Sequence, residues 1–152
     1  MSARPKCVDR QGGQQGQSAV EFALVIVSLV LLLFGMLEMT MFIYTYAALT
    51  GAAKEGVRYA VVHGASAASP SGPAAGPSGP GPGDVVSRVK AYGAASLHKL
   101  SDNNISVNYL DGNSNSPGSR VQVSVSYPYQ PLFGLRWASV TISANSVGRI
   151  MF

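Results

Sequence analysis

The residues that could do chemistry lie near the N-terminus, in the heptapeptide GQSAVEF of residues 16–22. Glu21 stands directly before a long apolar stretch, and a carboxylate buried in an apolar assembly needs a partner. Gly16 lies five residues earlier, and a glycine lets another backbone, such as that of a protease, approach closely. These residue types permit a close backbone contact at the glycine and require a partner for the carboxylate. An ordinary alternative is that Glu21 occupies the first turn of a helix, where the helix dipole favours acids.

The rest of the sequence offers no catalytic or metal-binding pattern. His63 and His98 are the only histidines, and no cysteine or acid stands at metal-ligand spacing from them. Ser96 lies near His98, but no nucleophile elbow surrounds it. No phosphate-binding glycine loop is present. We interpret the histidines as solvent-exposed and predict a non-enzyme without catalytic residues, metal or cofactor.

An apolar helix must position Glu21. No charged residue occurs from Phe22 to Leu37, and after Glu38 the sequence is again uncharged from Met39 to Ala53. About 20 helical residues cross a bilayer core of about 30 Å, so the stretch from Phe22 to about Phe42 is long enough. Because its apolar residues occupy the whole circumference of the helix, the sequence predicts a transmembrane helix in lipid and not a buried helix.

A polar leader precedes the helix and sets its orientation. Residues 1–16 hold three basic residues and one acid, which is +2 of the net charge of +4. These four are Arg4, Lys6, Arg10 and Asp9. By the positive-inside rule this end faces the cytoplasm. No basic stripe interleaved with aromatic residues follows, so we predict no nucleic-acid binding.

The helix is expected to continue beyond the membrane. From Tyr44 to Val62 the sequence has no proline and is rich in alanine, which favours helix. Ala48, Ala52 and Gly56 recur at four-residue spacing, so another helix backbone could approach closely along this stripe. A merely alanine-rich helix explains the same pattern equally well.

A small domain is predicted after a linker. Residues 64–83 contain only Gly, Ala, Ser and Pro, which is typical of a disordered linker. Asp84 then begins the pattern of an amphipathic helix. Three later segments alternate apolar and polar residues as strands do, and Pro128 and Pro131 are expected to break the second. These segments are 105–109, 121–127 and 140–144.

The predicted fold class is α+β, with one helix packed on a three-stranded antiparallel sheet in the outer domain. Four parts follow along the chain: a cytoplasmic leader at 1–16, a transmembrane and extended helix at 17–63, the linker at 64–83 and the extracytoplasmic domain at 84–152.

Three motifs along the helix resemble a known family. They are GQSAVEFAL at residues 16–24, FGMLE at 34–38 and AAKEGVRYA at 52–60. Together they are similar to the TadE-like family, the minor pseudopilins of the tight-adherence (Tad) pilus machinery. The resemblance covers about residues 14–62. The family often carries arginine in the place of Lys54, a difference that keeps the charge.

The resemblance implies a role for each residue of the N-terminal site. In type IV pilins and pseudopilins the prepilin peptidase, a membrane aspartic protease, cuts after the glycine, which here means between Gly16 and Gln17. Glu21, followed by Phe22, would then be the fifth residue of the mature chain. The resemblance implies that Glu21 pairs with the N-terminal amine of a neighbouring subunit during assembly.

Glu38 is a further candidate for subunit assembly. It lies about 26 Å along the helix from Glu21. A carboxylate inside lipid is costly and usually faces protein or water, so Glu38 could contact a neighbouring helix or a subunit of the machinery. It could equally lie at the outer interface or be protonated there.

The sequence thus predicts a minor pilin or pseudopilin that is processed by a prepilin peptidase and acts in pilus assembly, secretion or surface adhesion. The major subunits of these pili are much shorter, which favours a minor component. Expected partners are the peptidase, other pilins or pseudopilins, Tad assembly-platform proteins and the lipid bilayer. The expected location is the bacterial inner membrane, crossed once, with the C-terminal domain periplasmic or extracellular.

Two other classes compete with this interpretation. A signal-anchored extracytoplasmic binding domain unrelated to pili needs the anchor but not the Gly16–Glu21 site. A secreted protein with an ordinary signal peptide fits poorly, because the apolar run is too long and no small-residue cleavage site follows it closely.

Overall fold

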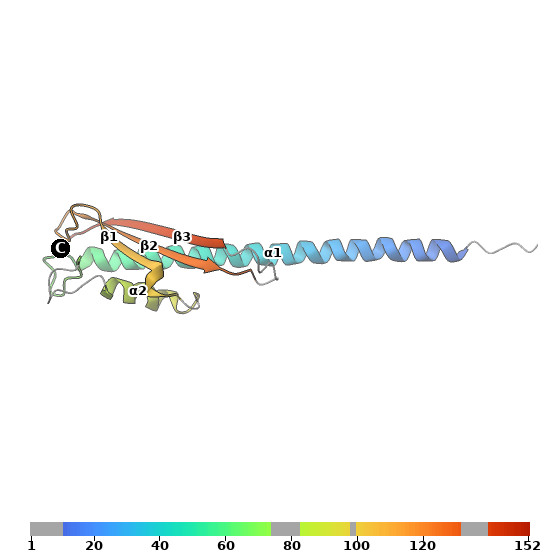
Figure 1. Cartoon of the computed structure of the whole chain (residues 1–152), viewed down its shortest axis with the longest axis horizontal. Coiled ribbons are helices and arrows are strands. Elements are labelled where there is room, and N and C mark those ends of the chain that lie inside the picture. Colours follow the sequence, from blue (N-terminus) through green and yellow to red (C-terminus); the bar gives the residue numbers. More distant parts are fainter. Residues whose placement is uncertain (1–10, 74–82, 98–99, 132–139) are drawn as a thin grey trace, which may run out of the picture. The chain divides into compact units, whose positions relative to one another are not determined.

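A computed structural model of the chain describes residues 11–73, 83–97, 100–131 and 140–152. It contains three helices and three strands within these ranges (Figure 1). In chain order they are α1 (Gln11–Val62), α2 (Gly83–Gly93), the short 3-10 helix η2 (Asp102–Asn104), β1 (Ile105–Tyr109), β2 (Arg120–Tyr129) and β3 (Val140–Arg149). The chain divides into two compact units, Met1–Met39 and Thr40–Phe152.

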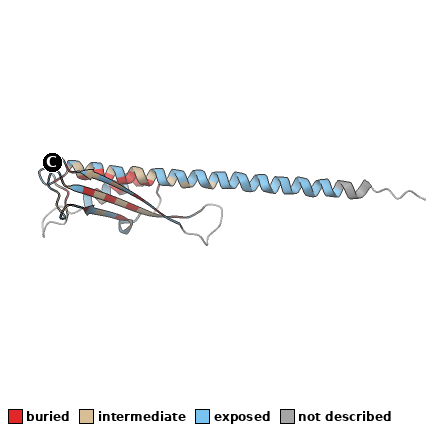
Figure 2. Cartoon of the chain, turned by 90° about the horizontal axis from the view of Figure 1, so that it is seen from above, coloured by how far each residue is buried: buried red, intermediate tan, exposed pale blue. Residues whose placement is uncertain are grey.

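The first unit consists, where it is described, of the N-terminal part of α1. Its large apolar side chains are exposed around the whole helix, with Phe22 and Leu31 both at 66% exposure. Figure 2 shows this stretch coloured as exposed. α1 is long and apolar enough to cross a membrane. The expected apolar N-terminal helix is confirmed, whereas residues 1–10 of the predicted leader lie outside the described ranges.

The second unit is built on an antiparallel sheet of order β1-β2-β3. Ile105 pairs with Val125 at one end of the β1–β2 ladder, and Tyr109 pairs with Val121 at the other. β2 and β3 pair along their whole length, from Arg120 opposite Arg149 to Tyr129 opposite Val140. Alternate residues of each strand are buried, so one face of the sheet forms the core.

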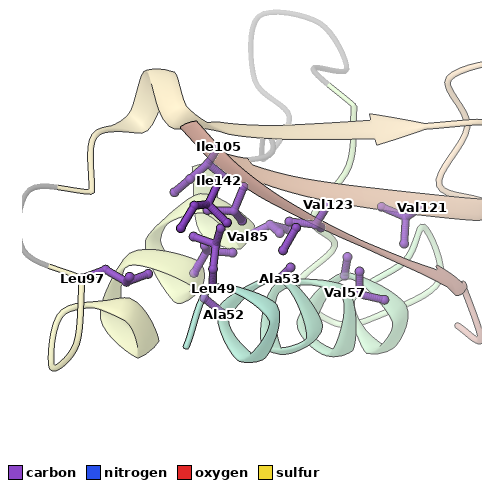
Figure 3. Packing of buried hydrophobic residues seen from close by; sticks show 14 of the residues in the cluster. Leu49, Ala52, Ala53, Val57, Val85, Leu97, Ile105, Val121, Val123 and Ile142 are labelled. Atoms are coloured by element: carbon purple, nitrogen blue, oxygen red, sulfur yellow. The ribbon is translucent and has the colours of Figure 1, made fainter. Parts of the chain in front are cut away.

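The core lies between that sheet face and two helices (Figure 3). α2 contributes Val85 and Val89, both fully buried, as the amphipathic pattern predicts. The C-terminal part of α1 contributes a second buried stripe, and Figure 3 shows its side chains directed at the sheet. This stripe consists of Leu49, Ala52, Ala53, Val57 and Ala60. The predicted α+β class with a helix on a three-stranded antiparallel sheet is confirmed, and α1 packs on the sheet as well.

Pro128 does not break the second strand, contrary to the expectation. β2 continues to Tyr129, and Pro128 stands opposite Thr141 of β3. The reason lies in the pairing: β1 reaches only as far as Val125, so Pro128 lies where β2 has a single neighbouring strand. A proline, which lacks a backbone N–H, is tolerated at such an edge.

The first half of the predicted linker packs against the domain. The Ser71 N–H donates to the carbonyl of His63 at 2.7 Å, and the Tyr109 hydroxyl donates to the carbonyl of Ser71 at 3.1 Å. Burial raises the pKa of the Tyr109 phenol, and the Ser71 hydrogen bond opposes that shift. Residues 64–73 thus differ from a featureless linker, while 74–82 lie outside the described ranges.

Candidate functional site

The predicted cleavage peptide, Gly16–Gln17, lies within α1. Gly16 is exposed, and a Cβ added to it would meet no atom within 4 Å in the described structure. The described chain therefore leaves the space beside Gly16 open. A helical peptide must still be locally opened before a protease can cut it, and a glycine weakens a helix by about 1 kcal/mol relative to alanine.

Glu21 does not occupy the first turn of the helix in the uncut chain. α1 begins at Gln11, so Glu21 lies more than two turns inside it and no acid stands in the first turn. The ordinary explanation by the helix dipole, which decays within the first turn, therefore does not apply to the uncut chain. Cleavage after Gly16 would change this, because Glu21 would then lie near the new helix start.

Gln17 and Glu21 already contact each other. The Gln17 side-chain amide donates a hydrogen bond to a Glu21 carboxylate oxygen at 3.3 Å, across one helical turn. Phe22, the next residue, is exposed. The structure thus brings together Gln17 and Glu21 of the predicted site. Glu38 lies on the same helix about 26 Å away and is partly buried.

The stripe of small residues on α1 is occupied by the chain itself. Ala52 is fully buried and Ala48 packs partly against the core. At Gly56 a Cβ would lie 2.5 Å from Cγ2 of Val89 in α2 and 3.2 Å from Cγ1 of Val123 in β2. The space beside Gly56 is therefore filled by α2 and the sheet of the same chain.

His63 is partly buried, which differs from the solvent-exposed position expected for it. Its ring stacks on Tyr59 with the centroids 3.9 Å apart, and Nδ1 lies 2.9 Å from the Tyr59 carbonyl oxygen. The Arg88 guanidinium covers the Tyr59 ring at 5.6 Å. These contacts account for the position of His63 as a packed side chain on α1 and the segment that follows it. His98 lies outside the described ranges, and the residues that are described contain no group of three metal-ligating side chains.

Two contacts at the start of the second unit join α1 to the rest of the domain. The rings of Phe42 and Tyr129 meet edge to face, with centroids 5.5 Å apart. The Tyr44 and Ser96 hydroxyls lie 3.0 Å apart, which is hydrogen-bonding distance. Sequence reasoning missed both contacts, because nothing in the local pattern of one segment identifies its partner in another.

The opposite end of the sheet carries an ion pair. The Arg120 guanidinium donates to Asp111 with a shortest N–O distance of 2.8 Å, and the Arg120 backbone N–H donates to the same carboxylate at 2.8 Å. These hydrogen bonds, together with the charges of Arg120 and Arg149, lower the pKa of Asp111 below its ordinary value of 3.8. Asp111 thereby closes the loop between β1 and β2.

Comparison with known proteins supports the sequence motifs. The family model of TadE-like protein matches residues 16–58. No curated protein and no solved structure matches the chain. The matched segment contains Gly16, Gln17, Glu21 and Glu38 and ends within the part of α1 that packs on the sheet. Residues 16–58 of this chain therefore match the TadE-like family, a family of Tad pilus-associated, pilin-like proteins and not of enzymes.

Proposed function

We propose that this chain is a minor pseudopilin, anchored in the inner membrane by α1, cut after Gly16 by a prepilin peptidase and assembled with other pilin-like subunits of the tight-adherence machinery. The observation that carries the proposal is the position of the Gly16–Glu21 site. It lies within the family match and directly before the stretch of α1 whose apolar side chains are exposed on every side.

The membrane anchor follows from the exposure of α1. A soluble protein would bury such a helix, because exposed apolar area in water costs about 25 cal/mol per Å². In the bilayer the same area costs nothing, and the backbone groups are satisfied within the helix. The basic residues Arg4, Lys6 and Arg10 favour a cytoplasmic N-terminus. The domain after Thr40 would then lie outside the cytoplasm.

Cleavage would create a new charge next to Glu21. The amine of Gln17 would lie one helical turn from the Glu21 carboxylate, on the same face of the helix. The Glu21 carboxylate could then pair with the N-terminal amine of its own chain. It could also pair with the N-terminal amine of a neighbouring subunit, if the helix of that subunit begins at the same depth as Glu21. Both pairings neutralise an acid at the edge of the apolar stretch, and only the second favours assembly.

The partners of the proposal follow from the same site. The peptidase acts on Gly16–Gln17, and other pilin-like subunits or assembly-platform proteins would contact the exposed face of α1 within the membrane. Glu38 lies on the same helix and is partly buried, and a neighbouring helix could add a contact to it, since an intramembrane acid is stabilised by protein contacts. Partners of the outer domain would lie in the periplasm or at the cell surface.

The test is the N-terminal sequence of the protein, determined by mass spectrometry on membranes prepared with and without the prepilin peptidase. A mature chain that begins at Gln17 only when the peptidase is present is the expected result. An intact N-terminus in both samples would contradict the proposal. It would favour the alternative of a signal-anchored domain unrelated to pili, which requires the helix but not the cleavage site.

A further inference from the structure

One end of the second unit contacts the part of α1 that directly follows the proposed membrane span. The twenty helical steps from Phe22 to Phe42 span about 30 Å, the thickness of the bilayer core. The whole bilayer, with its headgroups, measures about 40–45 Å. Each headgroup layer is therefore about 5–8 Å thick and corresponds to about three to five residues of helix. The outer headgroup layer would begin near Phe42 and end near Tyr46.

The sheet reaches this same level. Tyr129, the last residue of β2, holds its ring 5.5 Å from that of Phe42, and Val140, the first residue of β3, stands opposite Tyr129. Side chains on a helix point back toward its N-terminus, so the Phe42 ring lies on the membrane side of its own Cα. The ends of β2 and β3 are thus placed beside the helix at headgroup depth.

A second element arrives at the same level independently. The turn after α2 brings the Ser96 hydroxyl to 3.0 Å from the Tyr44 hydroxyl. Tyr44 belongs to the helical segment that crosses the headgroup layer, and its side chain is 56% exposed. Two separate segments of the domain therefore approach α1 within the few residues assigned to the outer interface.

The chemistry of this end suits a lipid interface. The segments 94–97, 129–131 and 140–143 contain no charged residue, while the ion pair of Lys90 and Asp102 lies at η2, whose Asn104 carbonyl accepts from the Ser126 hydroxyl. Val140 is 48% exposed, and Tyr44 combines an apolar ring with a hydroxyl, as side chains of interfacial aromatic belts do. The ion pair of Asp111 and Arg120 lies at the opposite end of the sheet.

We propose that the end of the outer domain formed by Ser96, Tyr129 and Val140 rests in the headgroup layer of the outer leaflet. The domain is then held against the lipid surface and does not stand clear of it on an extended helix. Lifting it free would require α1 to shift outward and draw apolar residues near Phe42 into water. This inference rests on the membrane anchoring proposed above and adds a lipid contact of the domain itself.

The experiment uses fluorescent labels on the full chain in phosphatidylcholine vesicles. Cys7 is the only cysteine, so a Cys7→Ser background accepts single cysteines at chosen positions. Val140→Cys and Gln130→Cys, both at exposed positions, test the proposed contact. Asn145→Cys on the same strand, about 17 Å further along β3, is the control outside the membrane. Leu33→Cys is the control within it.

The expected result is that nitroxides at the lipid headgroup quench most of the emission at 130 and 140 but little at 145. Nitroxides deep in the acyl chains should quench the label at 33. If the labels at positions 130 and 140 are quenched as little as the label at 145, while the label at 33 is quenched, the lipid contact is contradicted. The membrane anchor is then still supported. The lipid contact is also contradicted if the labels at 130 and 140 are shielded from iodide but are not quenched by the lipid nitroxides. Another copy of the chain would then cover this end. An unquenched label at 33 would overturn the anchor and the inference together.

Discussion

Gly56 of α1 faces Val89 of α2 so closely that a Cβ on Gly56 would lie 2.5 Å from a methyl carbon of Val89. Val89 is fully buried, and Val123 of β2 closes the same space from the sheet side. No side chain at this point can move aside without disturbing the core. The contact fixes the distance between the two helices of the domain.

We expect Gly56→Ala to destabilise the domain by about 1–2 kcal/mol. Overpacking of a core costs about 1–3 kcal/mol. The higher helix propensity of alanine relative to glycine offsets up to about 1 kcal/mol of this cost. Urea unfolding of the full chain in detergent, followed by circular dichroism, measures the difference. Gly51→Ala is the matched control: its Cβ would meet Tyr92, which is 54% exposed and can turn away. That variant should be unchanged or slightly more stable, and equal losses in both would contradict the packing argument.

The Asp111–Arg120 pair predicts a loss of stability in acid. The pKa of Asp111 is lower in the folded chain than the ordinary value of 3.8, so the unfolded chain binds this proton more readily. The stabilisation is therefore present above about pH 4 and is lost as the pH falls through the folded pKa. Asp111→Asn should flatten the dependence of the urea midpoint on pH in this acidic window.

A double-mutant cycle separates this pair from other acids. Arg120→Gln removes the main cause of the lowered pKa of Asp111, so it should flatten the same part of the pH profile. The double variant should then resemble either single variant. If the losses of stability of the two single variants add up in the double variant, Asp111 and Arg120 act independently. That result would contradict the hydrogen bonds between them.

Gly16→Val is expected to abolish cleavage. A β-branched side chain at this position would prevent the close approach of backbone and protease, whereas the described chain itself leaves room for it. Gly35→Val, at another helical glycine with no neighbour within 4 Å, is the matched control and should be processed normally. The measurement is the mass of the mature protein in cells that contain the peptidase. Failure of both variants would indicate a defect of membrane insertion and not of the cleavage site.

Glu21→Ala should be cleaved but assemble poorly. Removing the carboxylate leaves the new amine of Gln17 without its partner, so the attraction between neighbouring helix starts is lost. Cross-linking of subunits and counting of pili by electron microscopy report assembly, while the mature mass reports cleavage. Glu55→Ala, which removes a surface ion pair with Arg58, is the control and should assemble normally. Normal piliation with Glu21→Ala would contradict the amine-pairing role.

The long apolar helix, the strand alternation and the family match could be predicted from the sequence because each depends on local composition or spacing. The packing of the C-terminal part of α1 on the sheet could not be predicted so directly. Its buried residues include Leu49, Ala53 and Val57 at four-residue spacing, which is the signal of a packed helix face. In a helix that is apolar over most of its length, this signal is hidden by the uniformly apolar stretch beside it.

Pro128 and residues 64–73 show a second limit. A proline is incompatible with a central strand but not with the end of a strand that has lost one neighbour, and register is set by distant segments. Likewise, the composition of 64–73 predicts a linker, yet Asn115 and Tyr109 accept and donate hydrogen bonds that hold it. The Gly16–Glu21 motif, by contrast, lies in one short segment, so its pattern is visible in the sequence alone.

The C-terminal strand has a consequence for how the chain matures. β3 pairs with β2 over ten positions, Ile150 is buried, and the Met151 N–H donates to the carbonyl of Val61 at the end of α1. Strand β3 thus closes the core against a helix that is synthesised before it. Domains acquire their structure as the chain emerges, so on the proposed anchoring α1 can enter the bilayer while the sheet is still missing. A chain whose export stops short of β3 would then lack the strand that closes the core, so the membrane insertion of α1 and the folding of the domain are separate events in time.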